Sequence, residues 1–239
     1  MAGHSHFANI KHKKGAADAK KSKIFTKIQR EIISAVKTAN GESSEEFNPR
    51  LRLAIIKAKG INMPKDKIDS AIKKATGTTN GENFEYMRYD CYAPFGIGII
   101  IEALTDNKNR TAGEIRTLIT KCGGNMGETG SLDFIFTRLG VILYNKSNID
   151  FENLFEKSVE FDANNVEELD DYFEITTQFE NFHKLQIEIS QIFGDPIEAN
   201  IQYRPISQNS ISHDKLETIQ KLVDSLEDLD DVQNVWTGI

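Results

Sequence analysis

The chain has 239 residues, of which 39% are hydrophobic and 27% charged, and its formal net charge is −7. These values are ordinary for a soluble globular protein and leave room for two or three domains. No apolar run approaches the roughly 18 residues of a membrane span, and two cysteines without a C-x-x-C motif indicate free thiols and no zinc site.

The charge is divided unevenly along the chain. Residues 1–80 contain 17 Lys or Arg and 7 Asp or Glu, a net of +10, whereas residues 81–239 contain 12 and 29, a net of −17. Such a field draws a polyanion to one end of a protein and repels it from the rest. We therefore expect nucleic acid as the partner of the first third of the chain, and neither a membrane nor a small-molecule substrate.

Three short amphipathic helices are predicted within residues 22–76. Ser22 is suited to cap the first helix, whose apolar residues recur at three- and four-residue spacing, and Gly41 is suited to the left-handed position that ends it. Asn48 and Pro49 are the cap and the first residue of the second helix. Three helices with brief loops predict a small bundle, which we assign to residues 1–80.

After residue 80 the pattern predicts strands and helices in the order ββαββαβαβαβ, with a tight turn near Gly140 between the third and fourth strands. These eleven elements divide best into two two-layer α+β units of the split-βαβ type, either in series or with one inserted in the other. The predicted strands are Phe84–Tyr92, Gly96–Leu104, Leu132–Thr137, Val141–Tyr144, Tyr172–Thr177, Ile197–Tyr203 and Val232–Trp236, and the predicted helices are Thr111–Cys122, Phe151–Phe161, Phe182–Phe193 and Asp214–Leu226.

The basic residues of the N-terminal region are candidates for binding phosphate groups. Positions 20, 23, 27 and 30 share one helix face beside the apolar stripe, so we expect their charges to be available to nucleic acid. Lysine acts as a point charge without base preference, which predicts salt-dependent binding rather than sequence readout. The alternative is a solvated, lysine-rich helix face. The candidates are His4, His6, Lys11, His12, Lys13, Lys14, Lys20, Lys21, Lys23, Lys27, Arg30, Arg50 and Arg52.

A second contact loop is predicted where a buried strand ends and a helix begins, because ligands often bind at such polar loops. The same residues also make a good turn and helix cap. The glycine-rich stretch at 123–131 lacks the ending of a nucleotide-binding P-loop and is interpreted as a helix stop and a tight loop. Tyrosines 86, 89 and 92 are interpreted as core residues in preference to base-stacking ones. The loop candidates are Asn107, Lys108, Asn109, Arg110 and Asn125.

No catalytic site is predicted. An enzyme would need a base beside a nucleophile or a metal, and His183 and His213 stand apart from any such partner. The acidic runs at 167–171 and 227–231 lack calcium-loop spacing and are interpreted as solvated loops. We therefore expect no catalytic residue, cofactor or metal.

Several short motifs, in order along the whole chain, resemble those of the YebC/PmpR family. They are Ala2-Gly3-His4-Ser5, Ala8-Asn9-Ile10-Lys11-His12-Lys13-Lys14, Asp18-Ala19-Lys20, Lys23-Ile24-Phe25-Thr26-Lys27, Asn48-Pro49-Arg50-Leu51-Arg52, Asn62-Met63-Pro64, Asp106-Asn107-Lys108-Asn109-Arg110-Thr111, Lys121-Cys122-Gly123-Gly124-Asn125, Gly140-Val141 and Asp231-Val232-Gln233-Asn234-Val235. The chain departs from the family pattern at Phe7 and His6, and the turn at 91–96 has fewer glycines than usual.

The resemblance implies three domains: a helical nucleic-acid-binding domain at 1–80, an α+β domain at 81–138 plus 206–239, and an α+β domain at 139–205 inserted in it, both ferredoxin-like. Family members are described as transcriptional regulators that bind DNA. Others resemble ribosome-associated translation factors, including the mitochondrial translational activator of cytochrome c oxidase. The resemblance therefore implies a cytoplasmic, non-enzymatic regulator that binds DNA, or alternatively rRNA on the ribosome.

Overall fold

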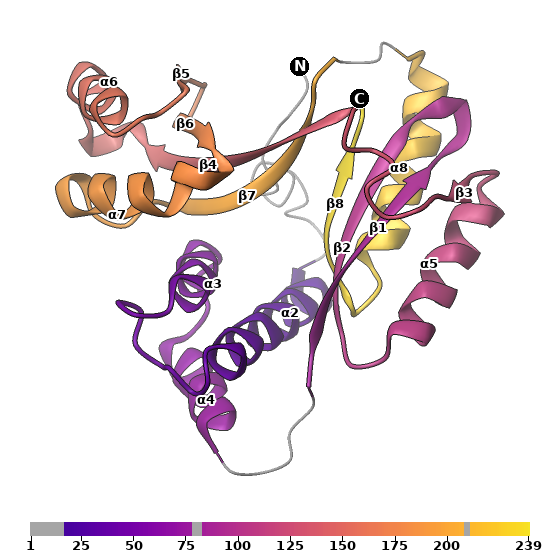
Figure 1. Ribbon diagram of the computed structural model, residues 1–239, viewed down its shortest axis with the longest axis horizontal. Coiled ribbons are helices and arrows are strands. Elements are labelled where there is room, and N and C mark those ends of the chain that lie inside the picture. The colour runs from indigo at the N-terminus through magenta and orange to yellow at the C-terminus, as the bar shows by residue number, and fades with distance from the viewer. Residues whose placement is uncertain (1–16, 78–82, 208–210) are drawn as a thin grey trace. The chain divides into compact units, whose positions relative to one another are not determined.

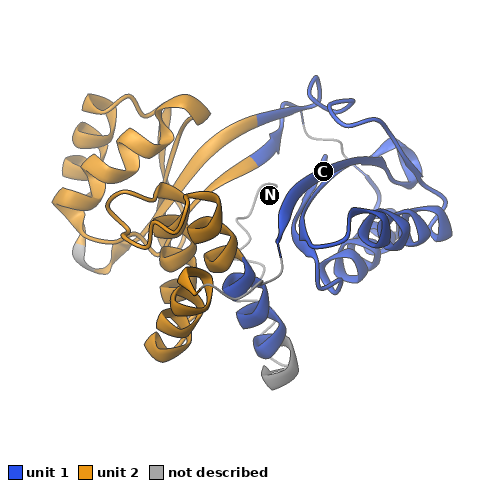
Figure 2. Cartoon of the chain, turned by 60° about the horizontal axis from the view of Figure 1, so that its bottom comes forward, with its two compact units in different colours: residues 1–30, 80–137, 203–239 blue, residues 31–79, 138–202 orange. Residues whose placement is uncertain are grey.

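The computed structural model describes residues 17–77, 83–207 and 211–239, and its fold is α+β, as predicted (Figure 1). Contacts divide the chain into two compact units (Figure 2). Unit 1 takes in the described parts of 1–30, 80–137 and 203–239, and unit 2 those of 31–79 and 138–202. The three-domain division stays a prediction, since these contacts group the helices after residue 30 with 138–202.

The N-terminal helices are α2 (Ala17–Thr38), α3 (Pro49–Gly60) and α4 (Lys65–Thr76). Asn48 caps α3 as predicted, because its side chain accepts a hydrogen bond from the Leu51 N–H (3.0 Å). Gly41 follows α2 with φ +88° and donates its N–H to the Val36 carbonyl (2.9 Å), which satisfies an end of the helix. Ser22, the expected cap of the first helix, was assigned wrongly: it lies inside α2, because the alanines and lysines before it continue the helix.

Unit 1 is a two-layer structure built on an antiparallel sheet of order β3-β1-β2-β8. Helices α5 and α8 cover one face of the sheet (Figure 1), and the core between the layers contains Ile99, Ile101, Ile115, Ile119 and Leu222. The strands are β1 (Glu85–Tyr92), β2 (Gly98–Thr105), β3 (Asn125–Met126) and β8 (Val232–Thr237), and the helices are α5 (Lys108–Lys121) and α8 (His213–Glu227), with a short 3₁₀ turn η1 (Pro94–Gly96) between β1 and β2.

Unit 2 contains the second sheet, of order β5-β6-β4-β7. Its core joins Ile142 and Ile175 of the sheet to Leu154 of α6 and Leu185 of α7, and Ile56 of α3 belongs to the same cluster. The elements are β4 (Phe136–Asn145), α6 (Phe151–Glu160), β5 (Asn165–Glu168), β6 (Tyr172–Gln178), α7 (Phe182–Phe193) and β7 (Glu198–Pro205), with 3₁₀ turns η2 (Lys146–Asn148) and η3 (Phe179–Asn181).

The predicted turn near Gly140 is wrong, because β4 runs without interruption through this residue. Gly140 pairs with Thr177 of β6 in the ladder. A Cβ atom at this position would lie 2.3 Å from Cδ2 of Phe182, so glycine is required by the close approach of a buried ring rather than by a turn. Two further strands, β3 and β5, were not predicted, since they are short and polar.

Candidate nucleic-acid interface

Six of the candidate residues precede residue 17 and lie outside the part of the chain that the structure describes. They are His4, His6, Lys11, His12, Lys13 and Lys14. Lys20 lies in the first turns of α2. Lys21 is exposed, with its ammonium group 5.7 Å from the centroid of the Phe25 ring. At the start of α2, therefore, Lys21 presents its charge at the protein surface.

The next three cations of α2 contact the protein itself. Each donates to a backbone carbonyl at the end of α8 or just after it: Lys23 Nζ to Asp228 (3.3 Å), Lys27 Nζ to Glu227 (2.6 Å) and Arg30 Nη1 to Asp230 (2.9 Å). The last carbonyls of a helix lack partners within the helix and carry the negative end of its dipole, so they attract cations. The expectation that this helix face is available to phosphate is thus corrected for Lys27 and Arg30, which are partly buried, whereas Lys23 remains exposed despite its hydrogen bond.

Asp231 forms the centre of a polar cluster beside these contacts, with only 3% of its surface exposed. Its Oδ1 accepts from Arg30 Nη1 (2.9 Å). Burial would raise the pKa of this carboxyl, but the hydrogen bonds from Arg110, Thr111 and Thr105 outweigh it and hold the pKa below its usual value. The interpretation of 227–231 as a solvated loop is therefore wrong for Asp231. Its Oδ2 accepts from Thr111 Oγ1 (2.6 Å), Arg110 Nη2 (2.7 Å) and Thr105 Oγ1 (3.0 Å).

A cleft of about 380 Å³ borders this cluster. Its lining includes Lys23, Arg30 and Arg110 but also Asp106, Glu114 and Asp228. Because charges of both signs line it, the cleft selects neither an anion nor a cation.

The predicted second contact loop is held by contacts within unit 1. Asn107 caps α5 by accepting from the Arg110 N–H (3.1 Å), and the Arg110 guanidinium pairs with Asp106 as well as Asp231 (2.7 Å each). Lys108 pairs with Glu85 (2.6 Å), whereas Asn109 is exposed. The turn-and-cap interpretation therefore accounts for most of these side chains.

Asn125, the remaining member of that set, lies at the opposite end of the sheet. It pairs with Tyr92 at the end of β1, whereas Thr105, which leads into the loop, pairs with Glu85 at the start of β1. A strand of this length separates the two by about 23 Å. The structure does not bring Asn125 together with the other four residues.

The glycine-rich segment is organised by a second buried carboxylate, that of Asp90. Oδ2 of Asp90 accepts from the N–H groups of Gly130 and Leu132 (3.0 Å each), and Arg88 pairs with the same carboxylate (2.7 and 2.9 Å). The amides that would cradle a phosphate are thus occupied by a fixed negative charge. Gly123, with φ +84°, ends α5, which confirms the helix-stop interpretation.

The three tyrosines of β1 are divided between the faces of the sheet. Tyr89 is buried in the core beneath α5 and α8. Tyr92 packs against the cluster around Ile100 on the other face. The core interpretation is confirmed for these two, but Tyr86 is 50% exposed.

In unit 2, Arg50 is exposed and Arg52 donates from Nη2 to the Glu46 carbonyl (2.9 Å). Burial lowers the pKa of His183, and the positive charges of Arg52 and Arg50 lower it further, so a positive potential exists here.

The exposed lysines of α4 were not among the predicted contacts, although the net charge of residues 1–80 already included them. These lysines are Lys65, Lys67, Lys73 and Lys74.

Two kinds of site are absent from the described ranges. No helix within 17–77, 83–207 or 211–239 is long and apolar enough to cross a membrane. In the same ranges, no group of three or more His, Cys, Asp or Glu residues is arranged to hold a metal ion.

Two family models match almost the whole chain. The TACO1/YebC protein N-terminal domain matches residues 5–78, and the TACO1/YebC second and third domain matches residues 84–239. A protein of Rickettsia bellii is 47% identical over 237 residues, covering 99% of this chain and 92% of the relative, and one of Geobacter sp. is 44% identical over 238 residues, covering 100% and 95%. Both are named "Probable transcriptional regulatory protein".

A solved structure is also similar. The crystal structure of a conserved hypothetical protein from Aquifex aeolicus superposes with a TM-score of 0.82 at 40% sequence identity, covering 98% of this chain and 96% of that one. The agreement extends over both units.

Proposed function

This chain belongs to the TACO1/YebC family, and on that premise we propose that it regulates gene expression by binding nucleic acid through its basic N-terminal region. In this proposal it is a cytoplasmic, DNA-binding transcriptional regulator, as the names of its relatives suggest. It acts by binding and not by catalysis.

The observation that carries the proposal is the net charge of +10 on residues 1–80 in an otherwise acidic chain. The structure refines which cations we expect to contact phosphate. Lys23, Lys27 and Arg30 fix the first half of α2 to the end of α8, so this helix is a firm support for the basic residues before it. We expect phosphate contacts from residues 11–21 and from the exposed lysines of α4.

A ribosome-associated translation factor that binds rRNA is the second candidate, favoured by the type of cation. The described cations that are exposed on α2 and α4 are lysines, which contact phosphate without reading base edges. No described helix carries Arg, Asn and Gln at the spacing of a recognition helix in the major groove. This pattern suits a backbone-binding protein on structured RNA as well as on DNA.

Crosslinking followed by sequencing of bound DNA and RNA separates the two candidates. Enrichment of promoter DNA supports transcriptional regulation and contradicts the ribosomal role, and enrichment of rRNA does the reverse. If neither nucleic acid is enriched over a mock sample, the proposed function is wrong in both forms.

A matched pair of variants tests the interface itself. Charge reversal at Lys20 and Lys21 should weaken duplex binding, whereas the same change at the exposed Lys184 and Lys221 of the acidic region should not.

For the unaltered protein, log affinity against log salt should have a slope of roughly −4 to −7, as five to eight phosphate contacts require. A slope near zero contradicts the proposal.

A further inference from the structure

Within the described residues, the second face of the unit 1 sheet packs against other segments mainly at its two ends. Successive side chains of a strand point to opposite faces, so residues 86, 88, 100, 102, 234 and 236 lie opposite α5 and α8. At one end of this face, Arg30 of α2 lies over the ring of Phe84 (5.5 Å). At the other end, Ile100 is buried with Leu132, Phe136 and Tyr203, and one side of Trp236 packs against this cluster.

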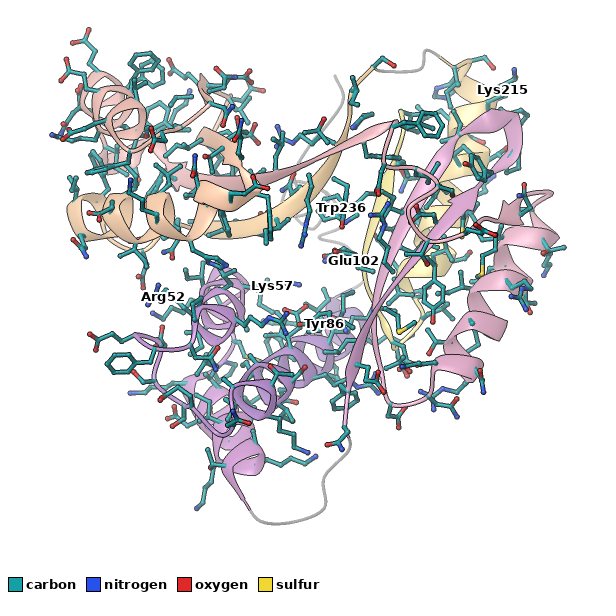
Figure 3. All side chains as sticks on the ribbon, viewed as in Figure 1. Arg52, Lys57, Tyr86, Glu102, Lys215 and Trp236 are labelled. Atoms are coloured by element: carbon teal, nitrogen blue, oxygen red, sulfur yellow. The ribbon has the colours of Figure 1, made fainter. Side chains whose placement is uncertain are left out.

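Between these ends lies a group of polar and aromatic side chains. Figure 3 shows Glu102 and Trp236 on the side of the sheet away from α5 and α8, with Tyr86 further along it. Glu102 pairs in register with Asn234, while Trp236 pairs with Ile100, so Glu102 lies diagonally beside the indole. Trp236, Glu102 and Asn234 are all partly exposed, and Tyr86 is 50% exposed.

Both polar neighbours of Glu102 bind the same carboxylate oxygen. Asn234 Nδ2 donates to Oε2 (2.9 Å), and Trp236 Nε1 donates to Oε2 (3.2 Å). Two donors use up the acceptor capacity of that oxygen. The other oxygen, Oε1, accepts from no side chain or amide in the described part of the chain, and it lies beside an aromatic ring that is not fully covered.

We infer that this face binds an unpaired nucleobase. The base stacks on Trp236, and its exocyclic amine donates to Oε1 of Glu102. A carboxylate acceptor favours cytosine, adenine and guanine, which present an exocyclic amine, over uracil or thymine, whose only donor to it, the ring N3–H, lies between two carbonyl oxygens that the carboxylate repels.

The charges around this face favour a base over the other ligand that a tryptophan and a glutamate attract, a cationic side chain. Arg88 stands directly opposite Glu102 in the register, and Arg30 of α2 borders the face at Phe84. Arg88 is already paired with Asp90 and Asp133, and Arg30 with Asp231, so neither guanidinium is available to a phosphate, but their positive charge beside Glu102 disfavours a further cation there. The face also adjoins α2, the helix that the proposed function assigns to nucleic-acid binding, and the inference rests on that function.

The site carries its own reporter, because Trp236 is the one tryptophan of the chain. Titration with single-stranded octamers of cytidine should quench its fluorescence through stacking, and uridine octamers should quench it less at equal concentration. A duplex of the same length should bind through the basic region without quenching. Parallel ribo- and deoxyribo-octamers show whether the base comes from RNA or DNA.

Variants separate stacking from base selection. Trp236→Leu should lower affinity for single strands by roughly 5- to 150-fold, the range for loss of one stacked base, and leave duplex binding unchanged. Trp236→Phe keeps a ring and should retain most of the affinity, measured by anisotropy of labelled octamers. Glu102→Gln should bring the cytidine-to-uridine affinity ratio close to one, because an amide both donates and accepts.

Three outcomes overturn the inference. Single strands that bind without quenching, and equally well to Trp236→Leu, remove the site but leave the proposed function standing. Failure of every strand and duplex to bind removes both. Quenching by an oligo-arginine peptide that octamers do not displace would show that the face takes a cationic peptide instead. Unchanged duplex binding by each variant is the control for folding.

Discussion

The cations on the first half of α2 and those on α4 differ in what their charged groups contact. Lys27 and Arg30 are partly buried and donate to carbonyls at the end of α8, as the exposed Lys23 also does, whereas Lys65, Lys73 and Lys74 are exposed and make no ion pair within the described residues. Both groups contribute equally to the charge of the N-terminal region. The net charge of the region therefore predicts that it attracts a polyanion, whereas the fold determines which of its cations are exposed to that partner.

The largest effect should follow from removing the Asp231 carboxylate, which binds Arg30 and Arg110. Asp231→Ala leaves Arg30, Arg110 and two buried hydroxyls without their common acceptor. We expect a loss of about 3 kcal/mol in the free energy of unfolding, measured by urea denaturation. Asp230→Ala, whose backbone carbonyl remains in place for Arg30, is the control and should cost far less. Equal losses would show that Asp231 is not the centre of the cluster.

A smaller effect should distinguish Lys27, which donates to a backbone carbonyl, from the exposed Lys21. Lys27→Met removes the hydrogen bond to the Glu227 carbonyl (2.6 Å) and should lower the free energy of unfolding by about 1 kcal/mol. Lys21→Met changes an exposed residue and should stay within about 0.5 kcal/mol of the original protein. Conversely, Lys21→Met should weaken duplex binding more than Lys27→Met. The reverse order would contradict the view that exposed lysines, and not those bound to the end of α8, contact phosphate.

Removing exposed lysines of α4 should change the salt dependence of nucleic-acid binding but not the free energy of unfolding. Lys73→Met with Lys74→Met should flatten the slope of log affinity against log salt by about one unit for each lysine that contacts a phosphate. Thermal unfolding should be unaltered, because both side chains are exposed. An unchanged slope would exclude α4 from the interface.

The smallest effect concerns the pKa of His183. Burial and the charges of Arg52 and Arg50 hold this pKa below its usual value, since they disfavour a protonated imidazole. Phosphates bound near those arginines would offset their charge, so the pKa should rise on binding, as followed by NMR titration of the imidazole. No change at His183 would place the nucleic acid elsewhere.

Much of the fold followed from local signals. The bounds of α7 were predicted at Phe182–Phe193, and the cap and first residue of α3 at Asn48 and Pro49, because periodicity and capping depend on residues close in sequence. Gly140 was mistaken for a turn residue, since the ring of Phe182 that requires a glycine there is not visible to any local pattern.

The candidate site was less predictable for the same reason. Helix periodicity identifies the polar face of α2 but not what that face meets. The acceptors of Lys27 and Arg30 lie about 200 residues later in the sequence. Asp231 could have been suspected, because it directly precedes β8, and the sequence offers Thr105 at the end of β2 and Thr111 near the start of α5. Its burial, however, depends on four segments meeting in three dimensions.

That separation in sequence has a consequence for biosynthesis. Ribosomes add roughly 5 to 20 residues per second, so the cations of α2 are made on the order of 10 to 40 seconds before the end of α8 is available to them. Throughout this interval the acceptors at the end of α8 are missing for Lys27 and Arg30, and the nascent chain displays a stronger positive charge than the finished protein. Residues 227–231 therefore shield part of the N-terminal charge once they are made.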